Sequence, residues 1–206
     1  GLLIAVQHDE FDYLRVTAEA VRRMSEGELL QIQKSRQKTI DEETYFRIIS
    51  DKTASLISTC CEVGAISAGV DAHERDALRQ FGELVGLAFQ IRDDVLDYTS
   101  RSSILGKPVG NDIRQQKITL PLIYACREAP SSEARQAIRT VKRGKVKDAD
   151  VEGVIAFVDR YNGISMANTK ANELRDQAVR LLQPFPATPY RQSLIDFANF
   201  VVLRNS

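Results

Sequence analysis

The chain lacks the features that mark several classes of protein. Its 206 residues hold 28 Lys plus Arg and 28 Asp plus Glu, and this balance argues against a nucleic-acid binder driven by bulk charge. The longest apolar opening, GLLIAV, is far too short to span a membrane, and it lacks the charged start of a signal peptide. Alternating β-branched runs are nearly absent, so little in the sequence predicts strands. With 43% hydrophobic residues, the chain is long enough for one core, and we expect a single helical domain over residues 1–206.

Cysteine and histidine are also scarce. The three cysteines, Cys60, Cys61 and Cys126, are odd in number, and two of them are adjacent. Neighbouring cysteines rarely pair without strain and no metal-ligand spacing is present, so we interpret all three as buried thiols in a reducing compartment. The two histidines, His8 and His73, fall outside the aspartate cluster DDVLD, and no zinc site is predicted.

Helix signals run through most of the chain as apolar residues at three- and four-residue spacing. Thr39 with Glu42, and Asp71 with Glu74, have the spacing of capping boxes that open long helices. We expect helices over about residues 9–32, 39–68, 71–98, 119–129, 131–144, 148–162, 164–183 and 188–204. Residues 99–116 carry glycines and a proline and are predicted to form a structured loop. The pattern predicts an all-α, antiparallel helix bundle.

Three aspartates interrupt the apolar stretch FQIRDDVLDY. On a helix Asp93 and Asp97 share a face, whereas Asp94 is turned about 100° away. Clustered carboxylates suit Mg²⁺, but the spacing alone leaves a solvated helix face equally open. The apolar neighbours favour a central helix, and the loop beyond it supplies Lys107 and Lys117. Each lysine taken singly is explained as a solvated charge; together with the aspartates they predict a metal-bridged phosphate site.

Several segments resemble one enzyme family. The stretch from GLAFQIRDDVLDY to LGKPVGNDIRQQKITLPLIYA closely resembles the second aspartate-rich region of trans-prenyl diphosphate synthases, in particular the long-chain type that makes octaprenyl-like polyprenyl diphosphates. MSEGELLQ and DKTASLISTCCEVGAISAG are similar to upstream helices of the family, and NGISMANTKANELRDQAVRLL fits more loosely. The resemblance extends over essentially the whole chain, and it implies a helical prenyl synthase fold with a deep cavity between helices.

The resemblance also implies a chemistry. In this family two facing aspartate-rich motifs hold Mg²⁺ on an allylic diphosphate, whose departure leaves an allylic cation. The double bond of isopentenyl diphosphate attacks this cation, and loss of a proton leaves the chain one isoprene unit longer. Carried over to this sequence, Asp93, Asp94 and Asp97 take the metal role, Lys52, Lys107 and Lys117 contact the allylic diphosphate, Thr53 and Gln90 orient the reacting ends, Phe89 packs beside the cation, and Asp112 supports the substrate from the loop. A cytoplasmic homodimer that hands its product to a membrane is implied as well.

One part of the family pattern is missing. The first aspartate-rich motif, with its downstream arginine pair, is nowhere in the 206 residues. Because the chain starts without Met inside a helical pattern, we expect an upstream portion, and we expect these residues alone not to catalyse elongation. The small residues Thr17, Ala18 and 64–69 are compatible with a long product cavity and equally with close helix packing.

Three alternative functions stay open. A non-catalytic regulatory partner subunit of a heteromeric prenyl synthase would usually have lost motif residues, whereas DDVLD and the lysines are intact. A terpene cyclase shares the metal chemistry but seldom keeps the GKPxGND loop. A generic helical interaction domain would leave the coincidence of separate motifs unexplained. A prenyl-elongating enzyme is therefore the leading hypothesis.

Overall fold

The computed structural model describes residues 2–35, 41–99 and 110–204, and these residues contain helices and no strand. The elements are α1 (Leu2–Gln7), α2 (Phe11–Ser35), α3 (Glu42–Ile49), the π-helix η1 (Ser50–Ala54), α4 (Ser55–Ala68), α5 (Ala72–Thr99), α6 (Asn111–Arg114), α7 (Leu120–Glu128), α8 (Ser131–Val141), α9 (Asp148–Arg160), α10 (Gly163–Leu181) and α11 (Pro189–Leu203). None of these described helices is long and apolar enough to cross a membrane. The predicted all-α class is confirmed.

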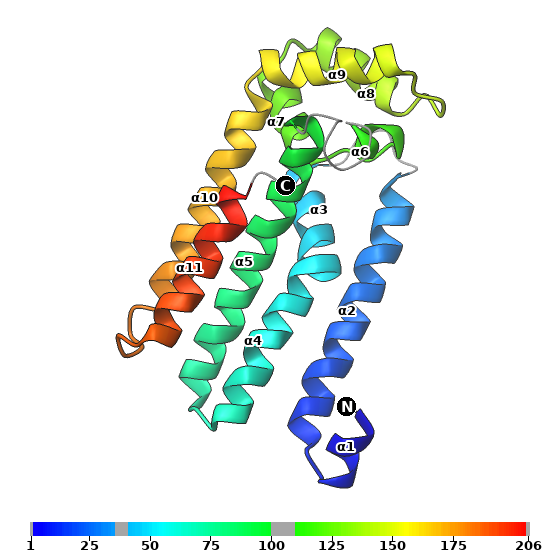
Figure 1. The fold of residues 1–206 in the computed structure, drawn as a ribbon. Helices are drawn as coiled ribbons and strands as arrows, with labels where there is room; N and C mark the ends of the chain where they lie inside the picture. Colours follow the sequence, from blue (N-terminus) through cyan, green and yellow to red (C-terminus); the bar gives the residue numbers. More distant parts are fainter. Residues whose placement is uncertain (1, 36–40, 100–109, 205–206) are drawn as a thin grey trace.

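The long helices run side by side along the molecule (Figure 1). Helix α5 packs against α4, α10 and α11, and α2 packs against α4 and η1. Helices α8 and α9 lie across one end of this bundle and pack on α7 (Figure 1). Helix α5, which carries the three aspartates, is thus held on several sides by other helices.

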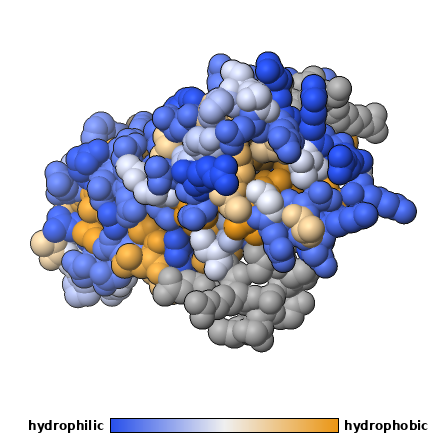
Figure 2. Space-filling model, turned by 90° about the horizontal axis from the view of Figure 1, so that it is seen from above, coloured by the Kyte–Doolittle hydropathy of each residue, from blue (hydrophilic) through white to orange (hydrophobic). Residues whose placement is uncertain are grey.

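The larger hydrophobic core lies between α5 and α10. Phe81, Val85 and Ile91 of α5 are almost completely buried, and they pack in one cluster with Ala167 and Ala171 of α10. The small alanines let the two helix axes approach closely. Burying each large apolar side chain contributes about 1.5–3 kcal/mol. Seen from above, hydrophilic residues cover most of the surface, with smaller hydrophobic patches between them (Figure 2).

Most helix starts follow local signals in the sequence. Asp71 Oδ1 accepts a hydrogen bond from the backbone N–H of Glu74 at 2.8 Å, as the predicted cap requires. Pro121 stands in the first turn of α7, where its missing N–H does no harm. The predicted cap at Thr39 lies outside the described residues; α3 is capped instead by Asp41.

Two segments differ from the sequence-based expectation. The predicted loop at residues 99–116 contains the short helix α6 in its described part. The long helix predicted over residues 39–68 changes to a π-helix at η1, where the N–H of Ser55 bonds the carbonyl of Ser50. Single π turns inside α-helices are rare and occur frequently at functional sites. Here the π turn carries Lys52 and Thr53, two of the predicted site residues.

The prediction of three buried thiols is wrong for Cys60. Its side chain is exposed, whereas Cys61 and Cys126 are partly buried, and all three are free. Successive residues of a helix point about 100° apart, so Cys60 and Cys61 do not both face the core. Burial raises the pKa of the Cys61 thiol and of the Cys126 thiol to about 11.

Candidate functional site

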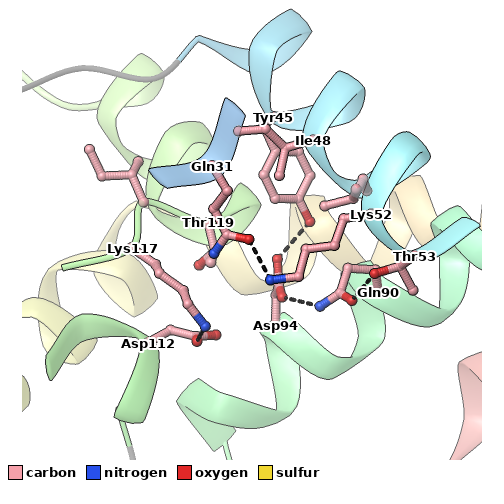
Figure 3. A pocket seen from close by; sticks show the side chains of 12 residues that line it. Gln31, Tyr45, Ile48, Lys52, Thr53, Gln90, Asp94, Asp112, Lys117 and Thr119 are labelled. Atoms are coloured by element: carbon pink, nitrogen blue, oxygen red, sulfur yellow. Dashed lines mark hydrogen bonds and ion pairs between the residues drawn. The ribbon is translucent and has the colours of Figure 1, made fainter. Parts of the chain in front are cut away.

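A cavity of about 100 Å³ lies where α2, α3, η1, α5 and the segment from α6 to α7 meet (Figure 3). Its lining consists of Gln31, Tyr45, Ile48, Ile49, Lys52, Thr53, Gln90, Asp94, Asp112, Lys117, Ile118 and Thr119. The fold therefore brings together six sequence-predicted site residues from three of these segments: Lys52, Thr53, Gln90, Asp94, Asp112 and Lys117. The cavity combines cationic, acidic and apolar side chains.

A chain of hydrogen bonds crosses one wall of the cavity (Figure 3). The hydroxyl of Tyr45 donates to Asp94 Oδ2 at 2.7 Å, and Gln90 Nε2 donates to Asp94 Oδ1 at 2.9 Å. The hydroxyl of Thr53 donates to Gln90 Oε1 at 2.9 Å. Both carboxylate oxygens of Asp94 and the amide oxygen of Gln90 are engaged, so these bonds fix the side chains of Thr53 and Gln90 relative to Asp94. Buried, satisfied networks of this kind hold side chains in one arrangement.

Asp94 is only 4% exposed. Burial raises its pKa to about 7, and the nearby Asp112 adds to this rise, while the hydrogen bonds from Tyr45 and Gln90 oppose it. Burial and the neighbouring Asp94 raise the pKa of the Tyr45 hydroxyl well above its usual value. A cation entering the cavity would favour the ionised form of Asp94.

The two lysines of the cavity are held by acidic or polar partners. Lys52 Nζ donates to Gln31 Oε1 at 2.7 Å and forms an ion pair of 2.6 Å with Glu28 of α2. Lys117 Nζ pairs with Asp112 Oδ1 at 2.9 Å. Lys52 enters from η1, whereas the Lys117–Asp112 pair enters from the opposite side, near α6 (Figure 3). Two ammonium groups facing one cavity from different elements suit an anion with several charged oxygens.

Asp93 does not line this cavity. Its carboxylate forms an ion pair with Arg204, the residue that follows α11. The Arg204 guanidinium also lies over the ring of Phe89, 4.0 Å from its centroid. Phe89 is likewise absent from the cavity lining. Arg204, just after α11, therefore contacts two of the predicted site residues that do not line the cavity; Asp97 is a third such residue.

Asp97 accepts hydrogen bonds from backbone N–H groups. Its two oxygens accept hydrogen bonds from the N–H groups of Asn111 at 3.0 Å and of Asp112 at 2.9 Å. Burial raises the pKa of Asp97, and these backbone hydrogen bonds oppose the rise. Asp97 thus fixes the start of α6, which in turn carries Asp112 to the cavity.

The positions of the carboxylates bear on whether they could bind the predicted Mg²⁺. Among the described residues, no group of three or more His, Cys, Asp or Glu side chains is placed to hold a metal ion. Asp94 and Asp112 do line the cavity together. Mg²⁺ is usually bound by one or two carboxylates plus substrate phosphates. The donor set fits Mg²⁺ shared with a phosphate ligand, and the metal role of Asp93, Asp94 and Asp97 stays a prediction.

Other residues differ from the sequence-based assignment of the site. Lys107 lies outside the described residues. The sequence-based assignment included no role for Glu28, Gln31 or Tyr45. Two of these residues, Glu28 and Gln31, belong to the segment MSEGELLQ. Tyr45 stands seven residues before Lys52, two helical turns away, and this spacing could have indicated that both face the same space.

A second, larger cavity of about 530 Å³ lies between α1, α2 and α4. Ile4, Ala5, Tyr13, Thr17 and Val63 contribute most of its mainly apolar lining, with His8 and Glu10. Among the described residues, its lining includes no lysine and none of the aspartates of α5. Thr17 is one of the small residues that the sequence associated with a long product cavity.

Comparisons with known proteins agree on one family. The polyprenyl synthetase family model matches residues 2–158. Octaprenyl diphosphate synthase of Escherichia coli (strain K12) is 34% identical over 192 residues, which cover 93% of this chain and 59% of that protein. Heptaprenyl diphosphate synthase component 2 of Geobacillus stearothermophilus is 34% identical over 191 residues, covering 93% and 58%. The chain thus spans about three-fifths of the length of these relatives.

A solved structure shares the fold over the whole chain. The crystal structure of a polyprenyl synthase from Caulobacter crescentus CB15, complexed with calcium and isoprenyl diphosphate, has a TM-score of 0.92 with this structure and 35% sequence identity. The match covers 100% of this chain and 62% of that protein.

Proposed function

Because the chain belongs to the polyprenyl synthetase family, we propose that it takes part in extending an allylic diphosphate with isopentenyl diphosphate. The observation that carries this proposal is the cavity in which Lys52 and Lys117 face Asp94 and Asp112. Cations and metal-binding carboxylates around one small space suit the diphosphate group of such a substrate. The bound calcium and isoprenyl diphosphate named for the Caulobacter structure support the same assignment.

In the proposed reaction the diphosphate is the leaving group, and its developing charge has to be neutralised. The diphosphate oxygens would replace Glu28 and Asp112 as the partners of Lys52 and Lys117. Asp94 and Asp112 would hold Mg²⁺. Asp93 is the residue that directly precedes Asp94 on α5. Bound Mg²⁺ supplies Lewis-acid stabilisation of the departing oxygens. Thr53 and Gln90, already fixed by the network on Asp94, would orient the diphosphate.

An allylic cation also needs walls that exclude water. Ile48, Ile49 and Ile118 line the same cavity as the charged side chains, and they would supply an apolar wall next to the leaving group. The predicted contact of Phe89 with the cation stays a prediction, because its ring is covered by Arg204 here.

The proposal also includes four further properties. They are a long-chain product, Mg²⁺ as the natural metal, a homodimer, and a cytoplasmic location with transient membrane contact. The large, mainly apolar cavity between α1, α2 and α4 supports a long product, because it offers space for hydrocarbon that is not lined by the lysines and aspartates of the first cavity. The likeness to octaprenyl diphosphate synthase points the same way. Chromatography of the product of a complete enzyme would test the chain length; a short product of two to four isoprene units would contradict it.

The binding step is tested with Lys52→Gln and Lys117→Gln. Titration calorimetry would measure the binding of inorganic diphosphate to the 206-residue chain in the presence of Mg²⁺. Each substitution removes a charge-assisted contact of about 1.5–3 kcal/mol, so we expect a loss of affinity of roughly ten-fold or more. Lys145→Gln, at an exposed lysine outside the cavity, is the matched control and should bind like the wild type. Equal affinity in all four proteins would contradict the proposed site.

A further inference from the structure

A cluster of charged side chains binds the π-helix η1 but does not line the cavity. Arg23 of α2 donates from Nε to Asp51 Oδ1 at 2.9 Å and from Nη2 to Ser50 Oγ at 2.8 Å. The same guanidinium binds both carboxylate oxygens of Glu83 of α5, at 3.0 and 3.2 Å. Ser50 donates in turn to Glu83. One partly buried arginine therefore links α2, η1 and α5.

The backbone of η1 is also enclosed by two glycines. A Cβ on Gly27 of α2 would lie 2.6 Å from the backbone nitrogen of Lys52. A Cβ on Gly86 of α5 would lie 2.5 Å from the Cα of Ala54. Both distances are far below van der Waals contact, so α2 and α5 approach the π turn as closely as a backbone allows. The position of η1 is determined by these two neighbours.

On α2 and on α5, the residues that contact η1 lie on the same helix face as a residue that lines the cavity. On α2, Arg23, Gly27 and Gln31 are spaced four residues apart, and Gln31 bonds Lys52. On α5, Glu83, Gly86 and Gln90 are spaced three and four residues apart, and Gln90 bonds Thr53. A shift of η1 along either helix would therefore break the contacts of Lys52 and Thr53 together.

We propose that Arg23 is a positioning residue of the diphosphate site, acting through the π turn that presents Lys52 and Thr53 to the cavity. The inference rests on the proposed function. The guanidinium holds the turn by binding Ser50 and Asp51, which both lie inside it. Lysine keeps the charge of arginine but lacks the planar fork that reaches several acceptors at once.

The test compares Arg23→Lys with Arg22→Met in the 206-residue chain. Arg22 is the exposed neighbour on α2 that pairs with Glu19 and Glu26, and it serves as the control. Calorimetry with inorganic diphosphate and Mg²⁺ would measure affinity, and circular dichroism would confirm the fold. We expect Arg23→Lys to weaken binding by about ten-fold or more, equivalent to at least about 1.4 kcal/mol, and the control to bind like the wild type.

A double-mutant cycle separates positioning from a general loss of structure. If Arg23 acts through Lys52, Arg23→Lys should weaken binding much less in a Lys52→Gln background than in the wild type. Fully additive effects would overturn the inference, as would wild-type affinity in a folded Arg23→Lys protein. If Arg23→Lys does not fold, Ser50→Ala removes the hydroxyl that bonds both Arg23 and Glu83 and should still lower affinity; unchanged affinity there also overturns the inference. A wild-type chain that binds no diphosphate would instead refute the proposed function itself.

Discussion

Replacing Asp94 by asparagine should stabilise the chain at neutral and alkaline pH, although Asp94 lines the cavity. The carboxyl is buried, and its two hydrogen-bond partners, Tyr45 and Gln90, carry no charge. Burial therefore raises its pKa to about 7. The ionised carboxylate therefore lowers the stability of the chain, and acids with a pKa raised in this way are frequent at functional sites.

The magnitude follows from the difference between the two pKa values. The ordinary value is 3.8, and the folded value is about 7. This rise of about three units corresponds to about 4 kcal/mol, at 1.36 kcal/mol per unit. Between these pH values the unfolded chain has lost the proton that the folded chain still binds, so the free energy of unfolding falls as pH rises from about 4 to about 7. Above about pH 7 the full loss of about 4 kcal/mol in the free energy of unfolding is present, and below about pH 4 this loss is absent.

Asparagine preserves the shape and both hydrogen bonds of the site. Its Oδ1 can accept from Gln90, and its Nδ2 can donate to the oxygen of Tyr45 once that hydroxyl turns. Urea unfolding, followed by circular dichroism at several pH values, would compare Asp94→Asn with the wild type. We expect similar stability near pH 4 and a gain of about 1–4 kcal/mol at pH 8, because the uncharged amide lacks the penalty.

The control for this experiment is Asp159→Asn, at an exposed aspartate of α9. Its stability should follow the pH dependence of the wild type. An Asp94→Asn protein that is less stable at pH 8, or that keeps the wild-type pH dependence between 4 and 7, would refute the assignment of a burial penalty to Asp94.

Two further predictions concern the π turn and the reaction. Gly86→Ala should lower the free energy of unfolding by about 1–3 kcal/mol in urea, because its Cβ would meet the Cα of Ala54 at 2.5 Å. Gly64→Ala is the control and should be neutral or stabilising by up to about 1 kcal/mol, since nothing lies within 4 Å of its Cβ. The 206-residue chain alone should not elongate an allylic diphosphate in a radiometric assay with Mg²⁺, because it contains a single DDxxD motif; steady turnover would contradict this.

Helix boundaries were predictable where the signal is local. Asp71, Pro121 and Thr188 mark helix starts because a cap or a first-turn proline involves only neighbouring residues. The π turn at η1 was not predictable in this way. It depends on the close approach of α2 at Gly27 and of α5 at Gly86, and neither contact is visible in a helical periodicity.

The same distinction between local signals and contacts across helices applies to the candidate site. The resemblance to a family supplied Lys52, Thr53, Gln90, Asp112 and Lys117, and the fold brings them to one cavity. The partners that hold them were missed, because Tyr45 on Asp94 and Glu28 on Lys52 are contacts across helices. Such contacts depend on the register between helices, which no single segment of sequence specifies.

The motif DDVLD shows why residue type and spacing do not define a ligand set. Asp93 and Asp97 share a helix face, as the spacing predicts, yet one meets Arg204 after α11 and the other meets backbone N–H groups of α6. Asp94, on a different face, is the one that reaches the cavity. Metal binding by all three therefore requires Asp93 to share or leave Arg204, and Asp97 to act through α6 or to give up its bonds there. Because α6 carries Asp112, the carboxylate of Asp97 already influences the cavity through the backbone that it holds.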